Sequence, residues 1–461
     1  MSLVPVAWTN DSSTCSKSSL VYCGYISDDF LSKFVSKLER RSPLINRGYF
    51  IRTWAFENVV RYFLEKNAPN LVQIVNLGAG YDTLCLRLAK ENLLSNCRKF
   101  VDVDQVPVVR KKHQILSDIS DWPPLIEYDK KSIVHCYRDN YGLLGCDLRS
   151  GRLYDLLKHK CQLSESLPTL FIAECVMNYL KPDEANTVIR IVSERFANGY
   201  VLTYEQIHPD DAFGQFMVKH FISIKSPLRH IECYPSSSSQ EIRFLDLGFG
   251  SVKTIDMLEI YRKSLTVEEK LRIESLEPFD EFEMWHLKCT HYALTFAATQ
   301  KSIDFYCSLM NRFNLSPFSK SCLSVADHSC IRTTYISEQK TTVRRFGHRC
   351  ATMKQRQQSV FITIGGYGQC PVRNSGHKRL DSLLCMDSGN FDLLTNIHDP
   401  LFARCYHSMV TLEDGRLLIF GGRHSPFKAL NDAFIVELST NAVNEDGVNF
   451  LISVVKFDSE L

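Results

Sequence analysis

The chain of 461 residues lacks an excess of charge of either sign, because 54 Lys and Arg residues are balanced by 52 Asp and Glu residues, for a formal net charge of +2. A nearly neutral chain has no field that attracts a polyanion over its whole surface. A nucleic-acid partner would therefore have to meet a local basic patch, for which Arg344, Arg345 and Arg349 are candidates. Most basic clusters of this size are simply solvated faces.

Long apolar runs are also missing. No stretch reaches the ~18 residues of a membrane-spanning helix, and the first residues, MSLVPVAWTNDSSTC, lack the basic start and apolar core of a signal peptide. The 17 cysteines are numerous, yet none are spaced as CxxC and none fits a zinc-ligand pattern. We therefore expect no membrane and no metal, and a cytoplasmic, reducing location in which the thiols stay free and act as small core hydrophobes.

Apolar runs and helical stripes alternate over the first 300 residues. Strands are expected over 71–78, 99–104, 169–176, 200–206, 252–258 and 292–298, and helices over 28–41, 51–64, 83–94 and 182–196. Strands that alternate with helices indicate a mostly parallel sheet covered on both faces, which is an α/β fold. Since ordinary domains hold roughly 100–200 residues, a chain of this length predicts two or three of them.

The pattern changes after about residue 300, where short β-rich runs and double glycines replace the helical periodicity. We therefore expect a first domain over 1–300, a linker over 301–340 and an all-β region over 341–461.

Two segments of the all-β region resemble each other. RRFGHRCATM with SVFITIGGYG parallels LFARCYHSMV with GRLLIFGGRH, so that His348 and His407 lie 59 residues apart, and Gly365 and Gly421 lie 56 apart. A period near ~50 residues with a strand ending in Gly-Gly is typical of kelch propeller blades. Only about two blades are visible, whereas a closed propeller usually needs about four to eight. The sequence therefore predicts a partial kelch propeller, either a truncated product or an array completed by something outside this sequence.

Two glycine turns compete as the cofactor loop, NLGAG at 76–80 and DLGFG at 246–250. The first follows a strand and precedes a helix and a second strand that ends in Asp102 and Asp104, which is the pattern of a nucleoside site. The second turn runs straight into another strand and is interpreted as a loop. Residue 83 is Thr, so the dinucleotide fingerprint GxGxxG is not fulfilled. This departure favours S-adenosylmethionine over a pyrophosphate cofactor.

Acidic side chains close several of the expected strands. Asp104 is best placed to accept both ribose hydroxyls, with Asp102 as the fallback two residues earlier. Asp147 can accept from an adenine amine while Leu148 packs on the ring, or it is an ordinary helix N-cap. Glu174 interrupts an apolar strand at its carboxyl end, where ligands of open α/β sheets bind. An unpaired buried carboxylate is costly, so Glu174 is predicted to be functional.

Residues 17–298 resemble the leucine carboxyl methyltransferase family throughout. The matching stretches are SPLINRGYFIR (42–52), QIVNLGAGYDT (73–83), VDVD (101–104), GCDLR (145–149), PTLFIAECVMNYL (168–180), TYEQ (203–206), FGQFM (213–217) and RIESLEPFDEFE (272–283). The resemblance implies a Rossmann-like class I methyltransferase fold over 1–300 with S-adenosylmethionine as its cofactor. One branch of the family methylates the C-terminal leucine of the protein phosphatase 2A catalytic subunit. A longer branch carries a kelch propeller and completes wybutosine on phenylalanine tRNA, and the blades after residue 340 favour this longer branch.

The resemblance also implies which residues bind the cofactor: Lys17, Arg52, Gly78, Gly80, Asp104, Asp147, Leu148 and Glu174. Lys17 lies in a poorly patterned segment, where a lysine is more often a solvated charge. Arg52 can grip a carboxylate with two parallel hydrogen bonds, and that carboxylate belongs either to the cofactor or to the substrate. Together with Arg52, Tyr179 and Tyr204 are the candidate catalytic residues that line the substrate mouth, although such aromatics are equally often core.

The implied reaction needs no general base, because a carboxylate is already ionised at neutral pH. For the longer branch it gives two products on the wybutosine side chain, a methyl ester of the carboxyl and a methoxycarbonyl group on the amine. We expect carbon dioxide or bicarbonate as co-substrate for the second product, because an amine and carbon dioxide form a carbamate oxygen that can be methylated in the same way. The alternatives are methylation of the phosphatase C-terminus and a non-catalytic kelch interaction protein.

The repeated basic residues of the blades have two interpretations. His348, Arg404 and His407, with Arg344 and Arg345, could contact tRNA phosphates. Since the Arg and His recur with the blade, packing between blades is the stronger interpretation.

Overall fold

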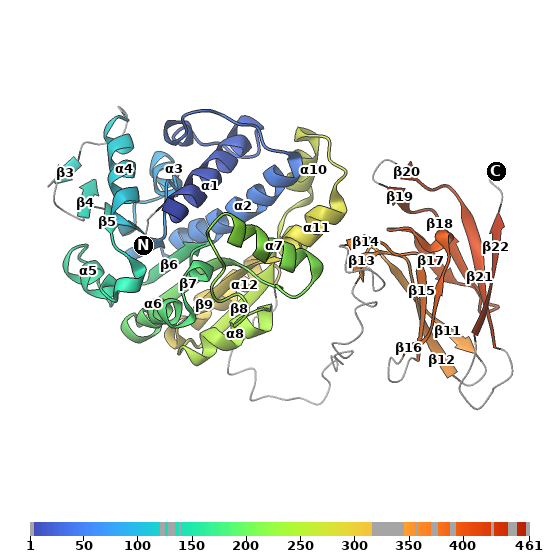
Figure 1. Cartoon of the computed structure of the whole chain (residues 1–461). Coiled ribbons are helices and arrows are strands. Elements are labelled where there is room, and N and C mark those ends of the chain that lie inside the picture. The colour runs from blue at the N-terminus through green and yellow to red at the C-terminus, as the bar shows by residue number, and fades with distance from the viewer. Residues whose placement is uncertain are drawn as a thin grey trace. The chain divides into compact units, whose positions relative to one another are not determined.

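The computed structural model describes residues 4–119, 125–127, 134–137, 140–315, 345–355, 358–369, 377–387, 393–425, 428–440 and 450–457. The chain divides into two compact units (Figure 1). The first consists of Met1–Asp210 and Gly214–His328, and the second consists chiefly of Ser329–Leu461.

A nine-stranded sheet forms the centre of the first unit. In spatial order its strands are β3 (Leu125–Glu127), β4 (Val134–Tyr137), β5 (Tyr141–Gly145), β2 (Cys97–Asp104), β1 (Val72–Leu77), β6 (Thr169–Glu174), β7 (Gly199–Gln206), β9 (Tyr292–Ala298) and β8 (Ser251–Asp256). The run from β5 through β2, β1 and β6 to β7 is parallel, while β9 is antiparallel to both of its neighbours. The expected strands are all present, and the predicted α/β class with a mostly parallel sheet is confirmed.

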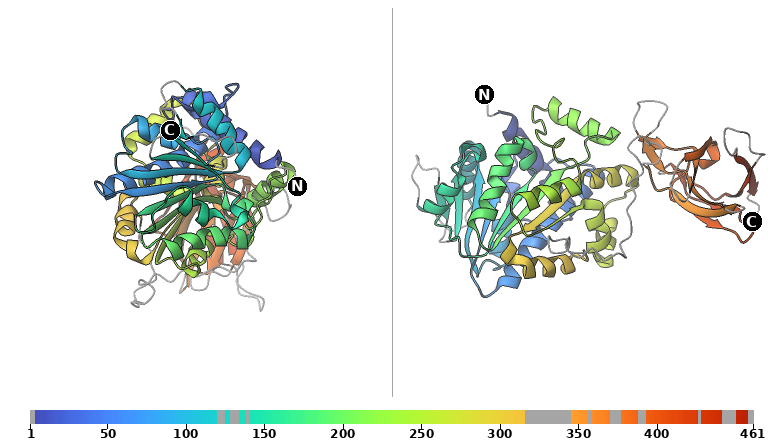
Figure 2. Two further views of the ribbon diagram at one scale, coloured as in Figure 1. Left: turned by 90° about the vertical axis from the view of Figure 1, so that its left-hand side faces the viewer. Right: turned by 90° about the horizontal axis from the view of Figure 1, so that it is seen from below.

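Helices cover both faces of this sheet (Figure 2). They are α1 (Val4–Tyr22), α2 (Pro43–Asn67), α3 (Leu84–Lys90), α4 (Val106–Ser117), α5 (Leu153–His159), α6 (Pro182–Arg195), α7 (Ala212–Ser223), α8 (Ser237–Asp246), α9 (Met257–Ser264), α10 (Val267–Leu276), α11 (Phe282–Thr290) and α12 (Ile303–Arg312), with the 3-10 turns η1 (Leu31–Phe34), η2 (Leu148–Ser150), η3 (Met177–Tyr179) and η4 (Gln300–Ser302). Within the described residues, no helix is both long and apolar enough to cross a membrane.

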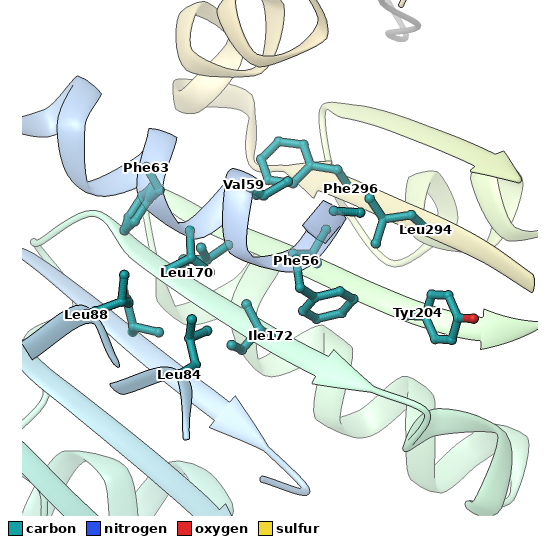
Figure 3. Close-up of a cluster of buried hydrophobic side chains, with 14 of the residues drawn as sticks. Phe56, Val59, Phe63, Leu84, Leu88, Leu170, Ile172, Tyr204, Leu294 and Phe296 are labelled. Atoms are coloured by element: carbon teal, nitrogen blue, oxygen red, sulfur yellow. The ribbon is translucent and has the colours of Figure 1, made fainter. Parts of the chain in front are cut away.

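Each face of the sheet buries its own apolar core, because successive side chains of a strand point to opposite faces. On one face, Phe56 and Phe63 of α2 pack over Leu170 and Ile172 of β6 (Figure 3). Tyr204 lies at the edge of this cluster with its hydroxyl group directed away from it (Figure 3). On the other face, the strands pack against α5, α6 and α8. The two cores fix the strand ends at which the site is built.

One expectation about the helices is wrong. The stretch 28–41 contains only η1, because the Asp28 carboxylate accepts from Phe30 N–H and Leu31 N–H, both at 2.9 Å, and the backbone is extended at Val35. Asp28 is itself held by Thr83 and Arg87 on the far side of the glycine turn. A tertiary contact therefore overrides the helical pattern.

The segment before it forms the helix α1, which the sequence analysis did not expect. Its buried residues include Thr14, Ser16, Ser18 and Ser19, so small polar side chains take the place of an apolar stripe. Ser19 donates to Asn46 Oδ1 at 2.8 Å and thereby joins α1 to α2.

The first unit extends past the expected boundary at residue 300. The helix α12 lies in the segment for which a linker was expected, and its Tyr306, Leu309 and Met310 are buried in the core of the first unit. The Tyr306 hydroxyl donates to the Val252 carbonyl of β8 at 2.8 Å. This helix therefore belongs to the first unit.

The second unit is all-β, and two of its sheets have four antiparallel strands each. The first of these contains β11 (Arg349–Gln355), β12 (Gln358–Ile364), β15 (Ser382–Asp387) and β16 (Leu393–His398), and the second contains β17 (Ser408–Thr411), β18 (Leu417–Phe420), β21 (Ala433–Thr440) and β22 (Phe450–Phe457). Shorter pieces are β10 (Arg345–Phe346), β13 (Tyr367–Gln369), β14 (His377–Arg379), η7 (Pro400–Phe402), β19 (Arg423–Ser425) and β20 (Lys428–Ala429). Both large sheets contribute to one apolar core. This architecture matches the predicted partial propeller of about two blades.

The repeated arginines of the blades are structural. Arg345 Nη1 donates to the Gly365 carbonyl at 2.9 Å, and Arg404 Nη1 donates to the Gly421 carbonyl at 2.8 Å. Each arginine thus holds the glycine pair that follows β12 or β18. Arg404 and His407 are almost fully buried. Buried side chains are not available to phosphates, so the packing interpretation holds for these positions.

The other basic candidates differ from one another. Arg349 is exposed and His348 is half-buried, while Arg344 lies outside the described residues.

Candidate functional site

The glycine loop after β1 is shaped for close backbone approach. Gly78 and Gly80 have φ values of +63° and +50°, a region that side chains disfavour. A Cβ atom at Gly78 would lie 2.5 Å from Val176 Cγ2, and one at Gly80 would collide with the Asn10 amide oxygen. Asn10 belongs to α1 and accepts from Tyr81 N–H at 3.1 Å. The loop therefore forms a tight cradle between β6 and α1 that only glycine fits.

The two acids at the end of β2 have different surroundings. Asp104 accepts from Gly80 N–H at 2.7 Å and from Gln105 N–H at 2.6 Å, and remains half-buried. Burial raises the pKa of Asp104, and the two N–H donors partly offset this. Asp102 is buried and accepts from Lys112 Nζ and from the Tyr141 hydroxyl, both at 2.7 Å. Asp102 is thus committed to the interior, which leaves Asp104 as the acid facing the loop.

Glu174, at the carboxyl end of β6, forms the centre of a cluster of charges. It accepts from Lys17 Nζ of α1 at 2.7 Å and from Arg52 Nε of α2. The side chains of all three are 11–15% exposed. Burial alone would raise the pKa of Glu174, but the Arg52 and Lys17 charges hold it below its usual value. Lys17 is therefore part of the site and not a solvated surface charge.

Asp82 joins this cluster from the loop after β1. Its Oδ1 lies 3.8 Å from Lys17 Nζ, and its Oδ2 accepts from Asn76 Nδ2 at 3.0 Å. Burial would raise the pKa of Asp82, but Lys17, Lys112 and Arg87 lower it. Asp82 was not predicted as a site residue, although it stands inside the stretch QIVNLGAGYDT.

Arg52 connects the charge cluster to a group of aromatic rings. Its guanidinium carbon lies 4.9 Å from the centre of the Tyr204 ring and 5.1 Å from that of Tyr49. Tyr204 stacks on Tyr292 with ring centres 5.3 Å apart. Burial raises the pKa of Tyr204 and of Tyr179. Tyr204 is buried and Tyr179 is half-buried, so of the two only Tyr179 has appreciable exposed surface.

Asp147 follows the end of β5 and caps η2. Its carboxylate accepts from Arg149 N–H at 3.0 Å and pairs with the Arg149 guanidinium at 2.7 Å. The N-cap interpretation is thus what the structure contains, and contact with an adenine amine stays a prediction. Leu148 is partly buried against the core of that face.

The site runs along the carboxyl-terminal ends of four neighbouring strands. β5, β2, β1 and β6 are neighbours, and their carboxyl ends carry Asp147, Asp104, the glycine cradle and Glu174 in that order. Since neighbouring strands lie about 4.8 Å apart, the row spans roughly 14 Å. The carboxylates along this row can accept hydrogen bonds, and the Glu174 end carries charges of both signs. Across the described parts of the chain, no three metal-ligating side chains gather.

Comparison with known proteins places this site in a family. A family model described as leucine carboxyl methyltransferase matches residues 22–193. The leucine carboxyl methyltransferase 1 homolog of Arabidopsis thaliana is 38% identical over 296 residues, which cover 63% of this chain and 87% of that protein. The chain belongs to the leucine carboxyl methyltransferase family. The resemblance stated from the sequence motifs is thereby confirmed.

Longer relatives match both units of this leucine carboxyl methyltransferase chain. The tRNA wybutosine-synthesizing protein 4 of Rattus norvegicus is 32% identical over 96% of this chain and 66% of the rat protein. The protein of the same name from Homo sapiens is 34% identical over 91% of this chain and 62% of the human protein. The chain therefore spans less than two thirds of the length of these relatives.

Other residues of the site could not have been found from the sequence. Asn10 lies on the unexpected helix α1, and no motif marks it. Glu205, inside the quoted stretch TYEQ, is buried and accepts from the backbone N–H groups of Val176, Met177 and Asn178 at 2.8–3.1 Å. It fixes the turn that follows Glu174, and burial raises its pKa to about 7.

Proposed function

We propose that this chain is an S-adenosylmethionine-dependent carboxyl methyltransferase that acts on phenylalanine tRNA in wybutosine biosynthesis. One observation carries the choice of substrate: the wybutosine-synthesizing relatives align over 91–96% of the chain, including the blades, whereas the Arabidopsis carboxyl methyltransferase aligns over only 63%. The proposed products are a methyl ester of the side-chain carboxyl and a methoxycarbonyl group on the side-chain amine.

The strand ends carry the residue types that the cofactor needs. The glycines let the backbone of the loop approach the ligand, Asp104 at the end of β2 would accept ribose hydroxyls, and Asp147 with Leu148 would face the adenine. Lys17 and Glu174 would bind the charged amino acid end, since their ion pair already brings both signs together. S-adenosylmethionine supplies an electrophilic methyl group when bound.

The residues of this chain have only to align and desolvate the acceptor. A carboxylate is ionised at neutral pH, so no proton has to be removed before its oxygen attacks. Alignment of two bound reactants can account for a large part of a methyl-transfer rate. Arg52, with the Tyr179 and Tyr204 rings beside it, is the group that orients the acceptor. The same pocket would serve the second product, because a carbamate formed from the amine and carbon dioxide presents an equivalent oxygen.

The test uses tRNA isolated from cells that lack the corresponding gene. Incubation of the purified chain with labelled S-adenosylmethionine should add label to the hypermodified nucleoside of phenylalanine tRNA, as read by mass spectrometry. Labelled bicarbonate should appear in the second product only. If the nucleoside acquires no methyl group, the proposed substrate is wrong.

The first alternative is methylation of the C-terminal leucine of the protein phosphatase 2A catalytic subunit. It is tested in the same assay with a peptide that ends in that leucine. The second alternative is a non-catalytic interaction protein, which would not need the charge cluster to bind a cofactor. Calorimetric titration with S-adenosylmethionine separates it from both enzymes, because only an enzyme needs the cofactor.

A further inference from the structure

Lys288 of α11 lies beside the charge cluster, although nothing in the reaction described so far uses it. Its side chain is half-buried. Among the residues that the structure describes, no carboxylate lies within 4.0 Å of its ammonium group. A lysine in such a position would ordinarily be paired.

The helix α2 makes room for this lysine at Gly48. A Cβ atom at Gly48 would stand 2.8 Å from Lys288 Nζ and 2.9 Å from Lys288 Cε. Gly48 lies within a 25-residue helix and has no positive φ, so its backbone conformation does not require glycine. The absence of a side chain instead leaves space for Lys288. The ammonium group therefore occupies the place of a side chain on α2.

Lys288 and Arg52 approach the same ring from α11 and α2. Lys288 Nζ lies 5.8 Å from the centre of the Tyr49 ring, and the Arg52 guanidinium carbon lies 5.1 Å from it. Gly48 and Arg52 are four residues apart and thus share one face of α2. Burial and the neighbouring Arg52 charge lower the pKa of Lys288 to about 8, although Cys289 opposes this. Two cations thus stand close together on this side of the cluster.

Positive charges outnumber negative charges where Arg52 and Lys288 lie together. Lys17 and Arg52 act on Glu174, while Asp82 is shared by Lys17, Lys112 and Arg87. Lys288 adds a further positive charge next to Arg52. Arg52 bonds Glu174 through Nε, and its two Nη atoms have no hydrogen-bond partner within the described residues. A planar anion with two oxygens would satisfy the outer edge of the guanidinium and the ammonium group together.

We propose that Lys288 and the outer edge of Arg52 bind the acceptor carboxylate, so that Lys288 is a substrate-binding residue. The proposal rests on the proposed carboxyl methylation but not on the identity of the acceptor. Lys17 and Glu174 are then left to the amino acid end of the cofactor. The acceptor oxygen would lie between Lys288 and the methyl group, next to Tyr49.

The experiment compares four variants of the full chain, each with S-adenosylhomocysteine present for binding and S-adenosylmethionine for turnover. K288M removes the charge, K288R keeps it, and G48A pushes the ammonium aside with a better helix former. K263M removes an exposed lysine of α9 and is the matched control for a general loss of positive charge. The readouts are KM and kcat for the free-acid tRNA, and the ratio of the Kd values for the free-acid and methyl-ester forms of that tRNA.

Loss of one hydrogen bond to a charged group corresponds to about a ten-fold or larger effect. K288M and G48A should raise KM about ten-fold and abolish the preference for free acid over ester, with the Kd of S-adenosylmethionine unchanged within about two-fold. K288R should restore most of the preference, and K263M should behave as wild type. In the wild type, KM should rise as the pH passes about 8, where the ammonium is lost, while Arg52 stays charged.

The outcomes separate the two proposals. If the wild type methylates a C-terminal leucine peptide and no tRNA, the tRNA function is wrong, and the same variants are measured with the peptide, which is also a carboxylate. If K288M keeps the wild-type KM and acid preference on the active acceptor, the carboxylate site is wrong. A weaker S-adenosylmethionine affinity in K288M, with an unchanged acid preference, would assign Lys288 to the cofactor and overturn the proposal. A wild type that is inactive on both acceptors would overturn both proposals.

Discussion

Replacement of Glu174 by Gln tests the charge cluster directly, because it removes the only carboxylate that contacts both Lys17 and Arg52 in the described structure. Both cations are 11–13% exposed. Breaking a buried ion pair on one side costs about 3–5 kcal/mol. Asp82 still lies 3.8 Å from Lys17, and a Gln oxygen still accepts a hydrogen bond, so we expect the lower end, about 3 kcal/mol.

Tryptophan fluorescence is a suitable assay, because all four tryptophans, at positions 8, 54, 122 and 285, belong to the first unit. A loss of about 3 kcal/mol corresponds to a Tm lower by about 4–5 °C for a unit of this size, because the entropy of unfolding is about 2.1 cal/mol/K per residue. E165Q is the control, since Glu165 pairs with Lys158 at the surface and should leave Tm unchanged. If E174Q melts within about 2 °C of the wild type, the cluster is hydrated and the reasoning fails.

The same variant has a defined pH dependence. Because the folded pKa of Glu174 is lowered, its contribution to stability is present above its unfolded value of about 4.5 and is lost as the pH falls through the folded pKa. The difference in Tm between the wild type and E174Q should therefore shrink under acid conditions. A difference that stays constant down to pH 3 would contradict this.

Three further changes should have measurable results. Burial raises the pKa of Glu205 to about 7, so its stabilising contribution is fully present below about pH 4.5 and is lost as the pH rises through 7. In thermal melts, the wild type should therefore lose stability relative to E205Q between these two pH values. G78A should weaken S-adenosylmethionine binding at least ten-fold in calorimetry, since its Cβ would collide with Val176. The control G151A, at φ +69° with open space around the new Cβ, should bind as wild type, and equal losses in both variants would mean that only backbone strain matters. R404A should lower the free energy of unfolding of the second unit in urea by about 3 kcal/mol, because it removes the buried ion pair of Arg404 with Asp432, while cofactor affinity is unchanged; a parallel loss of affinity would contradict this.

The sheet was predictable from the sequence because buried parallel strands read as continuous apolar runs. Every residue of β1, for example, is buried. The strand ends were predictable for the same reason: Gly78, Asp104 and Glu174 stand where such runs stop. Helices were predictable only where an apolar stripe faces a core, as in α2 and α6. The stretch 28–41 has an apolar stripe but does not form the expected helix, because Asp28 is held by residues more than 50 positions away in the sequence.

The interior of the site was less accessible to prediction. Lys17 and Glu174 are 157 residues apart, and only the packing of an unpatterned, serine-rich helix brings them together. Asp102 and Asp104 lie two residues apart on the same strand, so their side chains point to the same face of the sheet. Their roles differ because Lys112 of α4 pairs with Asp102, a contact that the sequence did not indicate. Arg345 and Arg404 recur with the blade because each binds a glycine carbonyl, a contact visible only in three dimensions.

The helix α1 brings Asn10 to the glycine loop and Lys17 to Glu174, although it contributes nothing to the sheet. A ligand that touches both the strand ends and α1 binds more tightly when the helix is docked, and by thermodynamic reciprocity the bound ligand holds the helix in place by the same free energy. Occupancy of the site and protection of the amide hydrogens of α1 are therefore linked quantities. Exchange rates in this helix should report on cofactor binding at every stage of the catalytic cycle.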